Sequence, residues 1–445
     1  MKKFLALALT LCIVFSLCAM SASAADKTTL NVMSFTTEVP DMITKYLEMK
    51  GLTDSVEVNT TIVATTDGLY QPALDQALAA ADDNAPDIYC AEAAFILKYA
   101  QGDACEFAAA YEDLGIDVAA ETAAAEIAPY TIDIGTRPSD GKLVGLGYQS
   151  TGGAFIYRRS IALDVWGNDD PAFVAEKIGA GSGNWDAFFA AAEELKAKGY
   201  AIVSGDGDIW HAVENSSDSG WVVDDKLVID QKRENFLDLS KQLMDNDYHN
   251  DTQDWTDDWY ADMAGTGKKG ILGFFGPAWL INYTMKDNVH DTFGDWAVCE
   301  PPVGFFWGGT WVLAGKTAVG SDKQELVADI IRWITLDCTE DGLQYKWANG
   351  TLNGEGGTKD DVASGTVLAM SNGEMEFLAG QNMFDVFVPA NAYANGKNLT
   401  QYDETINNYW RDAVRQYTAG TLSRDEALQA FKQNVADNLD VEVEF

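Results

Sequence analysis

Strand-like and helix-like segments alternate along the early part of the chain, and this alternation restricts the fold more than any other feature of the sequence. Residues 29–35, 56–64 and 86–91 carry the apolar pattern of β-strands, and residues 39–49 and 69–81 between them carry the pattern of helices. Strands joined through helices form parallel sheets, because each helix returns the chain to the same end of the sheet. The sequence therefore predicts an α/β fold with functional residues at the carboxyl ends of these strands.

The same kind of pattern continues towards the carboxyl terminus. Residues 186–198 have the spacing of an amphipathic helix, and a strand is predicted directly after it at 200–204. Ser423 and Glu426 form the capping-box pattern that begins a helix. Strands and helices are thus expected along most of the chain, without a long unstructured segment.

The length of 445 residues suits two domains better than a single core. No linker, repeat or low-complexity block separates two halves of the sequence, so we expect the chain to pass between two lobes more than once. We predict an N-terminal lobe formed by residues 25–147 and 301–336. The C-terminal lobe is predicted to comprise residues 148–300 and 337–445.

The amino-terminal residues have the pattern of a secretory signal. Two lysines precede an apolar stretch from Phe4 to Leu17, and the small residues Ala22-Ser23-Ala24 follow it. This pattern predicts a signal peptide over residues 1–24 and a mature protein secreted from the cytoplasm. Attachment of a lipid to Cys18, with association to the cell surface, is the alternative, although the residues before Cys18 match a lipobox poorly.

Charge and cysteine usage narrow the partners. The formal net charge is −39 at pH 7, and such a surface repels nucleic acid and anionic lipid, so we expect a soluble monomer with no nucleic-acid partner. The sequence contains no C-x-x-C pair and only three scattered histidines, so we expect no metal and no cofactor. The mature cysteines, Cys90, Cys105, Cys299 and Cys338, either form one or two disulfides or are small buried residues.

An acidic segment at residues 245–256 partly matches a calcium-binding EF-hand loop. It has Asp at positions 1, 3 and 7 of the loop, but it lacks the Gly at position 6 and the Glu at position 12. We interpret it as a solvated acidic loop.

Several segments, in this order, resemble one protein family. The matching segments are PDIYCAEAAF (86–95), GGAFIYRRSIALDVWG (152–167), WDAFFAAAEELKAKG (185–199), GFFGPAW (273–279), WGGTWVLAGK (307–316) with IIRWITL (330–336), and YWRDAVRQYTAGTLSRDEAL (409–428). They resemble the extracellular solute-binding proteins of sugar ABC transporters, the class that includes maltose-binding protein. The resemblance implies two α/β lobes, each a mostly parallel sheet flanked by helices, joined by crossover strands around a cleft that closes by hinge bending.

The candidate ligand-binding residues follow from the chemistry of sugars and from the resemblance. Aromatic rings stack on the C–H faces of a sugar, while carboxylates and amides bind its hydroxyls. The resemblance implies that Trp279 and Trp410 stack on sugar, and that Asp206, Asp208 and Trp210 form an acidic-aromatic group. Strand ends and turns supply the other candidates, which are Phe35, Thr37, Glu38, Asp67, Glu92, Tyr148, Gln149, Trp307 and Trp311. Core packing is the alternative for each tryptophan, and satisfying N–H groups in a turn is the alternative for the two aspartates.

The sequence thus predicts a sugar-binding receptor, for an oligosaccharide in preference to a monosaccharide, that delivers its ligand to the membrane permease of an ABC importer. A secreted glycoside hydrolase or lyase is the alternative, because paired carboxylates beside aromatic rings also describe glycosidase clefts. Against an enzyme, neither G-x-S-x-G nor H-E-x-x-H occurs. A cell-surface adhesin is a third class, which repeats or a wall anchor would indicate, and we find neither.

Overall fold

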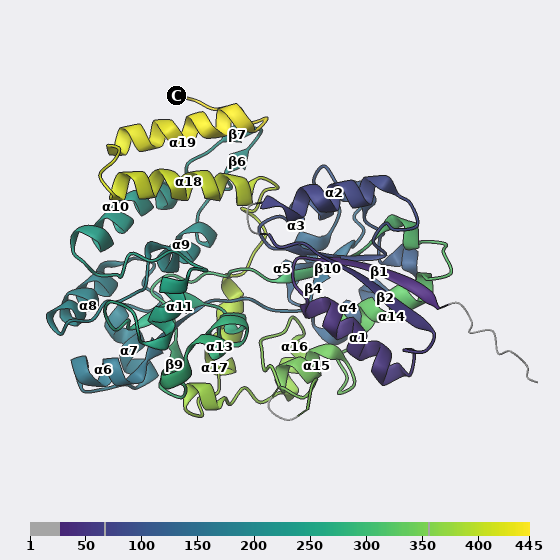
Figure 1. The fold of residues 1–445 in the computed structure, drawn as a ribbon, viewed down its shortest axis with the longest axis horizontal. Helices are drawn as coiled ribbons and strands as arrows, with labels where there is room; N and C mark the ends of the chain where they lie inside the picture. Colours follow the sequence, from purple (N-terminus) through teal and green to yellow (C-terminus); the bar gives the residue numbers. More distant parts are fainter. Residues whose placement is uncertain (1–26, 66–67, 355–356) are drawn as a thin grey trace, which may run out of the picture.

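The computed structural model describes residues 27–65, 68–354 and 357–445, and it shows two α/β lobes side by side (Figure 1). One lobe is built on a five-stranded sheet and the other on a three-stranded sheet. This arrangement confirms the predicted two-lobed α/β architecture. The predicted signal peptide and Asp67 lie outside the described residues.

The sheet of the first lobe has the strand order β2-β1-β3-β10-β4. Its strands are β1 (Thr28–Ser34), β2 (Val56–Ile62), β3 (Ile88–Glu92), β4 (Gly145–Gly147) and β10 (Thr310–Ala314). Strand β1 is parallel to β2 and to β3, as the alternation of strands and helices predicts. Strand β10 is antiparallel to both of its neighbours, because the chain re-enters this sheet from the other lobe.

Helices cover both faces of the first sheet (Figure 1). They are α1 (Glu38–Lys50), α2 (Tyr70–Ala80), α3 (Ile96–Ala100), α4 (Val118–Ala125), α5 (Pro129–Gly135), α14 (Gln324–Thr335), α15 (Leu343–Ala348) and α16 (Gly365–Met370). Helix α1 presents Val39, Met42, Ile43 and Leu47 to the core, at the spacing that places them on one face. The predicted helices at 39–49 and 69–81 are therefore confirmed.

The sheet of the second lobe differs from the prediction. Its strands β5 (Ala154–Arg158), β8 (Gly273–Gly276) and β9 (Trp296–Cys299) are ordered β8-β5-β9, and both pairs are antiparallel. The expectation of a mostly parallel sheet is wrong here. These strands are buried almost throughout, so their sequences are apolar runs that carry no information about direction. The predicted strand at 200–204 is reduced to a single parallel bridge between Ala201 and Ile271.

The helices of the second lobe surround this small sheet. They are α6 (Arg159–Trp166), α7 (Pro171–Ile178), α8 (Asp186–Ala197), α9 (Asp206–Asn215), α10 (Gln231–Asp245), α11 (Asp257–Ala264), α12 (Ala278–Leu280), α13 (Lys286–Asn288), α17 (Phe384–Ala390), α18 (Asp403–Thr418) and α19 (Arg424–Asn438). A two-stranded ribbon of β6 (Val222–Val223) and β7 (Lys226–Leu227) lies at its edge. Helix α19 begins with the predicted capping box, in which Ser423 and Glu426 each satisfy the backbone N–H of the other.

Two segments that join the lobes run side by side. Residues 148–153 connect β4 to β5, and residues 300–309 connect β9 to β10. The backbone N–H of Gly153 donates to the carbonyl of Phe305 at 2.9 Å, and that of Trp307 donates to the carbonyl of Thr151 at 3.1 Å. A Cβ atom on Gly153 would lie only 2.1 Å from the ring of Phe305, so this close approach requires glycine.

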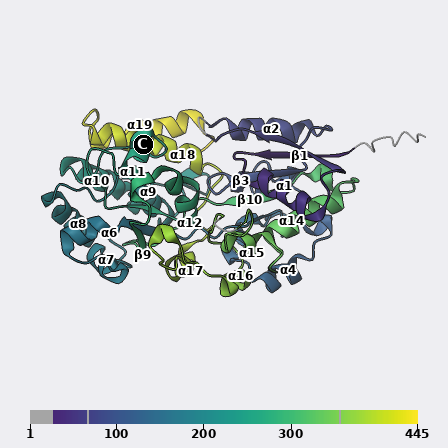
Figure 2. The same cartoon turned by 60° about the horizontal axis from the view of Figure 1, so that its bottom comes forward.

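Helices α15 and α16 pack on the first lobe, where they contact α14 and α4 (Figures 1 and 2). The hydroxyl of Thr366 donates to the carbonyl of Ala124 at 3.0 Å. The predicted boundaries assign this segment to the C-terminal lobe, because no linker in the sequence marks where the chain changes lobe. The remaining boundaries stay a prediction.

The cysteines and the helices bear on two further expectations. All four cysteines among the described residues are free, and Cys90 and Cys299 are buried, which favours the packing alternative over disulfides. No helix within the described ranges has the length and apolar character needed to cross a membrane.

Candidate ligand-binding site

Four aromatic side chains, Trp255, Trp279, Tyr283 and Trp307, come together where the second lobe meets the crossover segments, and we call them the aromatic wall. Trp279 follows the Gly276-Pro277 turn after β8, and its Nε1 donates to the carbonyl of Trp307 at 2.9 Å. Its ring lies 4.6 Å from that of Trp307 and 6.2 Å from that of Trp255, nearly parallel to the latter. Trp255 and Tyr283 are 45% and 53% exposed, so ring surface remains open to a ligand.

Tyr283 stands in a short π-helical turn, Ile281–Met285, between α12 and α13. Such turns are rare and occur frequently at functional sites. Here the turn places the Tyr283 ring edge-on to both Trp255 and Trp279, at 6.5 Å from each.

A buried polar layer supports the wall from behind. The imidazole of His211, on α9, stacks on Trp307 with ring centres 3.5 Å apart and an angle of 15°. Its Nε2 lies 3.5 Å from Asp254, whose carboxylate accepts a hydrogen bond from Arg411 Nη1 at 2.9 Å. Burial lowers the pKa of His211, which keeps the ring neutral. Burial alone would raise the pKa of Asp254, but the guanidinium of Arg411 lowers it overall.

The polar layer passes very close to the start of α9. A Cβ atom on Gly207 would lie 2.2 Å from Asp254 Oδ1 and 2.6 Å from Arg411 Nη2. Only glycine leaves room for this ion pair. Asp206, beside it, lies 3.6 Å from Arg411 and accepts a hydrogen bond from the Ser240 hydroxyl at 2.6 Å.

Carboxyl groups of the first lobe face the aromatic wall. Glu92 ends β3 and accepts the backbone N–H of Ala94 at 2.8 Å. A Cβ atom on Gly308 would lie 3.2 Å from both Glu92 Oε1 and Trp279 Cζ2, so a carboxyl group of one lobe and a ring of the other flank the same glycine. Burial raises the pKa of Glu92 to about 7, and Glu404 and Glu214 contribute.

A second carboxyl group lies at the start of α1. The hydroxyl of Tyr148 donates to Glu38, and burial raises the pKa of Glu38 to about 7. Burial raises the pKa of Tyr283, a residue of the aromatic wall, and the charge of Glu38 contributes to this increase. Gln149 Nε2 donates to Asp360 at 3.1 Å, and burial raises the pKa of Asp360 to about 6.

A comparison with known protein families identifies the family of this chain. A model of the family described as bacterial extracellular solute-binding protein matches residues 44–337. The chain belongs to this family. No curated protein matches the chain in a search by sequence.

Solved structures show the same fold at low sequence identity. This solute-binding protein is 16% identical to the galacto-N-biose-/lacto-N-biose I-binding protein of Bifidobacterium longum, solved with lacto-N-biose, over 94% of this chain and 99% of that one, with a TM-score of 0.68. It is also 16% identical to the substrate-binding protein Lmo0181 of Listeria monocytogenes, solved with cycloalternan, over 93% and 99% of the two chains, with a TM-score of 0.65. The resemblance found in the sequence is therefore confirmed.

The structure brings part of the predicted site together. Glu38, Glu92, Tyr148, Trp279 and Trp307 lie at the junction of the lobes described above, together with Gln149 beside Asp360. Phe35 is half-buried, with its ring centre 5.7 Å from that of Tyr70 and 6.1 Å from that of Phe95. Thr37 is exposed directly before Glu38.

Other predicted residues serve the core of the solute-binding protein instead. Trp210, Trp311 and Trp410 are 1%, 1% and 0% exposed and have no ring face open to a ligand. The predicted stacking role of Trp410 is contradicted by this burial. The carboxylate of Asp208 accepts hydrogen bonds from the backbone N–H groups of Ser204 and Gly205, both at 3.0 Å, at the start of α9. This agrees with the alternative in which Asp208 satisfies N–H groups in a turn.

Sequence reasoning missed His211, Asp254, Trp255, Tyr283 and Arg411. His211 and Arg411 directly follow the predicted Trp210 and Trp410, and successive residues of a helix point about 100° apart. When the tryptophan faces the core, its neighbour therefore faces the site. Trp255 lies in the acidic segment interpreted as a solvated loop, and a tryptophan in such a polar run was the available signal.

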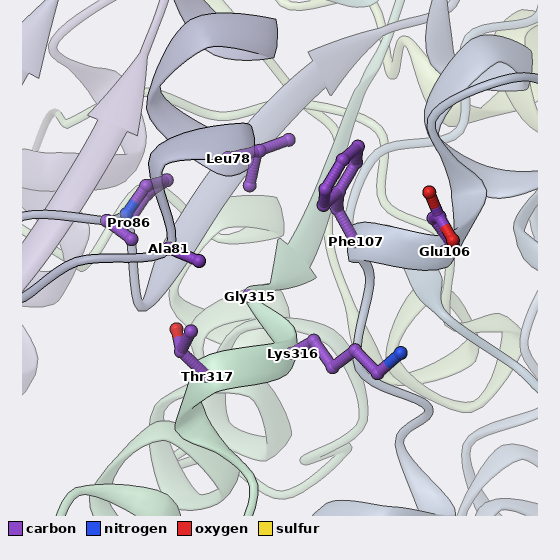
Figure 3. A pocket seen from close by; sticks show the side chains of 9 residues that line it. Leu78, Ala81, Pro86, Glu106, Phe107, Gly315, Lys316 and Thr317 are labelled. Carbon is purple, nitrogen blue, oxygen red and sulfur yellow. The ribbon is translucent and has the colours of Figure 1, made fainter.

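A separate surface pocket of about 340 Å³ lies in the first lobe (Figure 3). Leu78, Pro86 and Phe107 form its apolar lining, and Gly315 to Thr317 follow the end of β10. Since β10 runs antiparallel to β3, the pocket lies at the opposite end of these strands from Glu92. The pocket therefore does not belong to the site at the aromatic wall.

Proposed function

We propose that this solute-binding protein is an extracytoplasmic receptor for an oligosaccharide and that it delivers the sugar to the membrane permease of an ABC importer. One observation carries the proposal: the aromatic wall of the second lobe meets carboxyl groups of the first lobe, with Glu92 and Trp279 both close to the Cβ position of Gly308. Indole rings cover the C–H face of a pyranose, and carboxylates accept the hydrogen bonds of its hydroxyls.

The extent of the aromatic wall supports an oligosaccharide over a single sugar ring. The planes of Trp255 and Trp279 are within 8° of each other, with centres 6.2 Å apart, and Tyr283 extends the surface further. Several neighbouring rings offer stacking to more than one pyranose. The relatives solved with lacto-N-biose and cycloalternan also bind sugars of more than one ring.

Hinge closure supplies the signal that the ligand is bound. Contacts already connect the lobes: Gln71 of α2 donates to Glu404 of α18, and the backbone N–H of Asp103 donates to Gln401 Oε1 at 3.1 Å. A sugar that contacts both lobes binds the closed form more tightly and shifts the equilibrium towards it. We infer that a monomer in this closed form docks on the permease subunits.

A glycoside hydrolase is disfavoured as the alternative. Glu38 and Glu92 have raised pKa values, as a general acid needs, but Glu38 is bonded to Tyr148 and Glu92 to the backbone of Ala94. These bonds fix the carboxyl groups as acceptors at the cleft wall. The family consists of receptors, which agrees with binding without turnover.

A thermal-shift screen tests the proposal. Maltotetraose, cellotetraose and lacto-N-biose are added to the purified protein, and a sugar present at 100 times its Kd is expected to stabilise the folded state by about 2.7 kcal/mol. Chromatography of the same samples should recover each sugar intact. Cleavage of the bound sugar would favour the hydrolase, and the absence of a shift across a broad panel of oligosaccharides would reject the receptor.

A further inference from the structure

Carboxyl groups from both lobes gather beside the aromatic wall. Glu92 comes from the end of β3 in the first lobe, and Glu214 and Glu404 come from α9 and α18 in the second lobe. They are close enough that the charges of Glu404 and Glu214 raise the pKa of Glu92 further, after burial. Each carboxyl group has a neutral hydrogen-bond donor: Glu214 accepts from Asn407, and Glu404 accepts from Gln71.

The basic side chains that act on these groups are bound to other partners. Arg411 lies between Asp254 at 2.9 Å and Asp206 at 3.6 Å. Lys98 forms an ion pair with Asp75 at 2.5 Å. The guanidinium of Arg233 is buried 4.3 Å from the ring centre of Trp221. Arg411 and Lys98 are therefore ion-paired, and the guanidinium of Arg233 also donates to the carbonyl of Ser219 at 3.0 Å.

Glu38 and Asp360 are also carboxyl groups whose hydrogen-bond donors are neutral. Both groups face the site through neutral donors, Tyr148 and Gln149. The nearest cation in electrostatic terms is Lys286, whose Nζ donates to Asn282 Oδ1 at 2.7 Å and whose charge acts on Asp360. The negative groups around the aromatic wall therefore outnumber the positive ones.

From this arrangement we propose that the site selects uncharged oligosaccharides and rejects acidic ones, such as sugars that contain a uronic acid. The inference rests on the proposed function and specifies its substrate class. An acidic sugar has to give up the hydration of its carboxylate at a poorly solvated site where most of the surrounding charged groups are negative. The hydroxyls of a neutral sugar instead donate hydrogen bonds to the same carboxylates. These carboxylates therefore attract uncharged oligosaccharides and repel acidic ones.

The decisive experiment compares matched sugars. Maltotetraose, cellotetraose and lacto-N-biose are titrated by calorimetry at pH 8, each against the same sugar with one C6 hydroxymethyl group oxidised to a carboxylate. At pH 8 the carboxyl groups of Glu92 and Glu214 are ionised, because their pKa values are about 7. For every neutral sugar that binds, the acidic form should bind at least tenfold more weakly.

A variant separates charge from shape. Glu404→Gln keeps the size of the side chain and removes one charge, so the ratio of neutral to acidic affinity should fall at least threefold; Glu48→Gln, on the exposed face of α1, should leave the ratio unchanged. If Glu404→Gln strongly lowers the melting temperature, Glu214→Gln is used as the test variant instead. Equal or tighter binding of an acidic sugar, or an unchanged ratio in the variant, overturns this inference and leaves the receptor intact. Failure of all sugars to bind rejects the receptor itself.

Discussion

The second lobe contains two groups of tryptophans whose sequence contexts look alike and whose environments differ. In the aromatic wall, Trp255 is exposed and Trp279 is half-buried, and the crossover segment of Trp307 lies behind them. In the other group, Trp410 lies fully buried, with its ring centre 5.7 Å from Trp221 and 5.0 Å from Phe431. A tryptophan thus becomes a binding surface only where no other segment of the chain covers its ring.

The largest effect is expected from Trp410→Ala, because this ring is wholly inside the core. The substitution leaves a cavity against Trp221 and Phe431, so the free energy of unfolding should fall by about 3–5 kcal/mol. Chemical denaturation measures the loss, and titration of the remaining folded protein should show sugar affinity preserved. Trp166→Ala, at a half-buried position on α6, is the control and should cost less. A loss of affinity without loss of stability would place Trp410 in the site after all.

Trp279→Ala is expected to lower sugar affinity more than stability, the opposite of Trp410→Ala. Removal of a central stacking ring is expected to weaken sugar binding by about 2–4 kcal/mol, with a smaller change in melting temperature. Trp279→Phe is the matched control: it keeps an aromatic face but loses the Nε1 donor to the Trp307 carbonyl, and it should recover most of the affinity. If the alanine variant binds sugar normally, the aromatic wall is not the ligand platform.

Gly207→Ala tests the layer behind the wall. The added methyl group collides with Asp254 and Arg411, and overpacking of this kind costs about 1–3 kcal/mol. Both stability and sugar affinity should fall, since the displaced Asp254 supports His211 under Trp307. Ser216→Ala, at the end of the same helix, is the control. Calorimetry and thermal unfolding of both variants measure the two effects, and a drop in stability alone would separate the layer from binding.

The last expected effect is a pH dependence of the stability of the ligand-free protein. Burial raises the pKa of Glu38, Glu92 and Glu214 from about 4.5 to about 7, so the folded state binds more protons than the unfolded state between these values. Stability should therefore decrease as the pH rises from 5 to 8, because the buried carboxyl groups have to ionise in the folded state. Asp254, with a lowered pKa, loses its contribution only at much lower pH. Glu92→Gln should flatten the dependence of melting temperature on pH, and an unchanged slope would contradict the assignment.

The parts of the fold that were predicted depend on local patterns. The strands and helices between Thr28 and Glu92 follow from apolar spacing, and the parallel order of β1, β2 and β3 follows from their alternation. The capping box at Ser423 was likewise readable, because it involves residues three apart. The antiparallel order of the second sheet could not be predicted from the sequence, since its strand directions depend on where the chain crosses between the lobes.

The site was predicted only in part for the same reason. Glu92 and Trp279 were predicted to lie near the junction of the lobes because Glu92 ends a strand and Trp279 closely follows one, and the ends of strands are fixed by local sequence. The choice between Trp210 and His211, or between Trp410 and Arg411, depends on how α9 and α18 are rotated in the packed lobe. That rotation is decided by partners outside these helices, such as Trp221 and Asp254.

The position of β10 in the first sheet sets the order in which the protein can be completed during its synthesis. Strand β10 lies between β3 and β4, so the sheet keeps a gap until residue 314 has left the ribosome. The core of the second lobe is completed even later, because it includes Trp410 and Phe431. Contacts this distant in sequence form slowly. Neither lobe can therefore complete its packing until most of the chain has been synthesised.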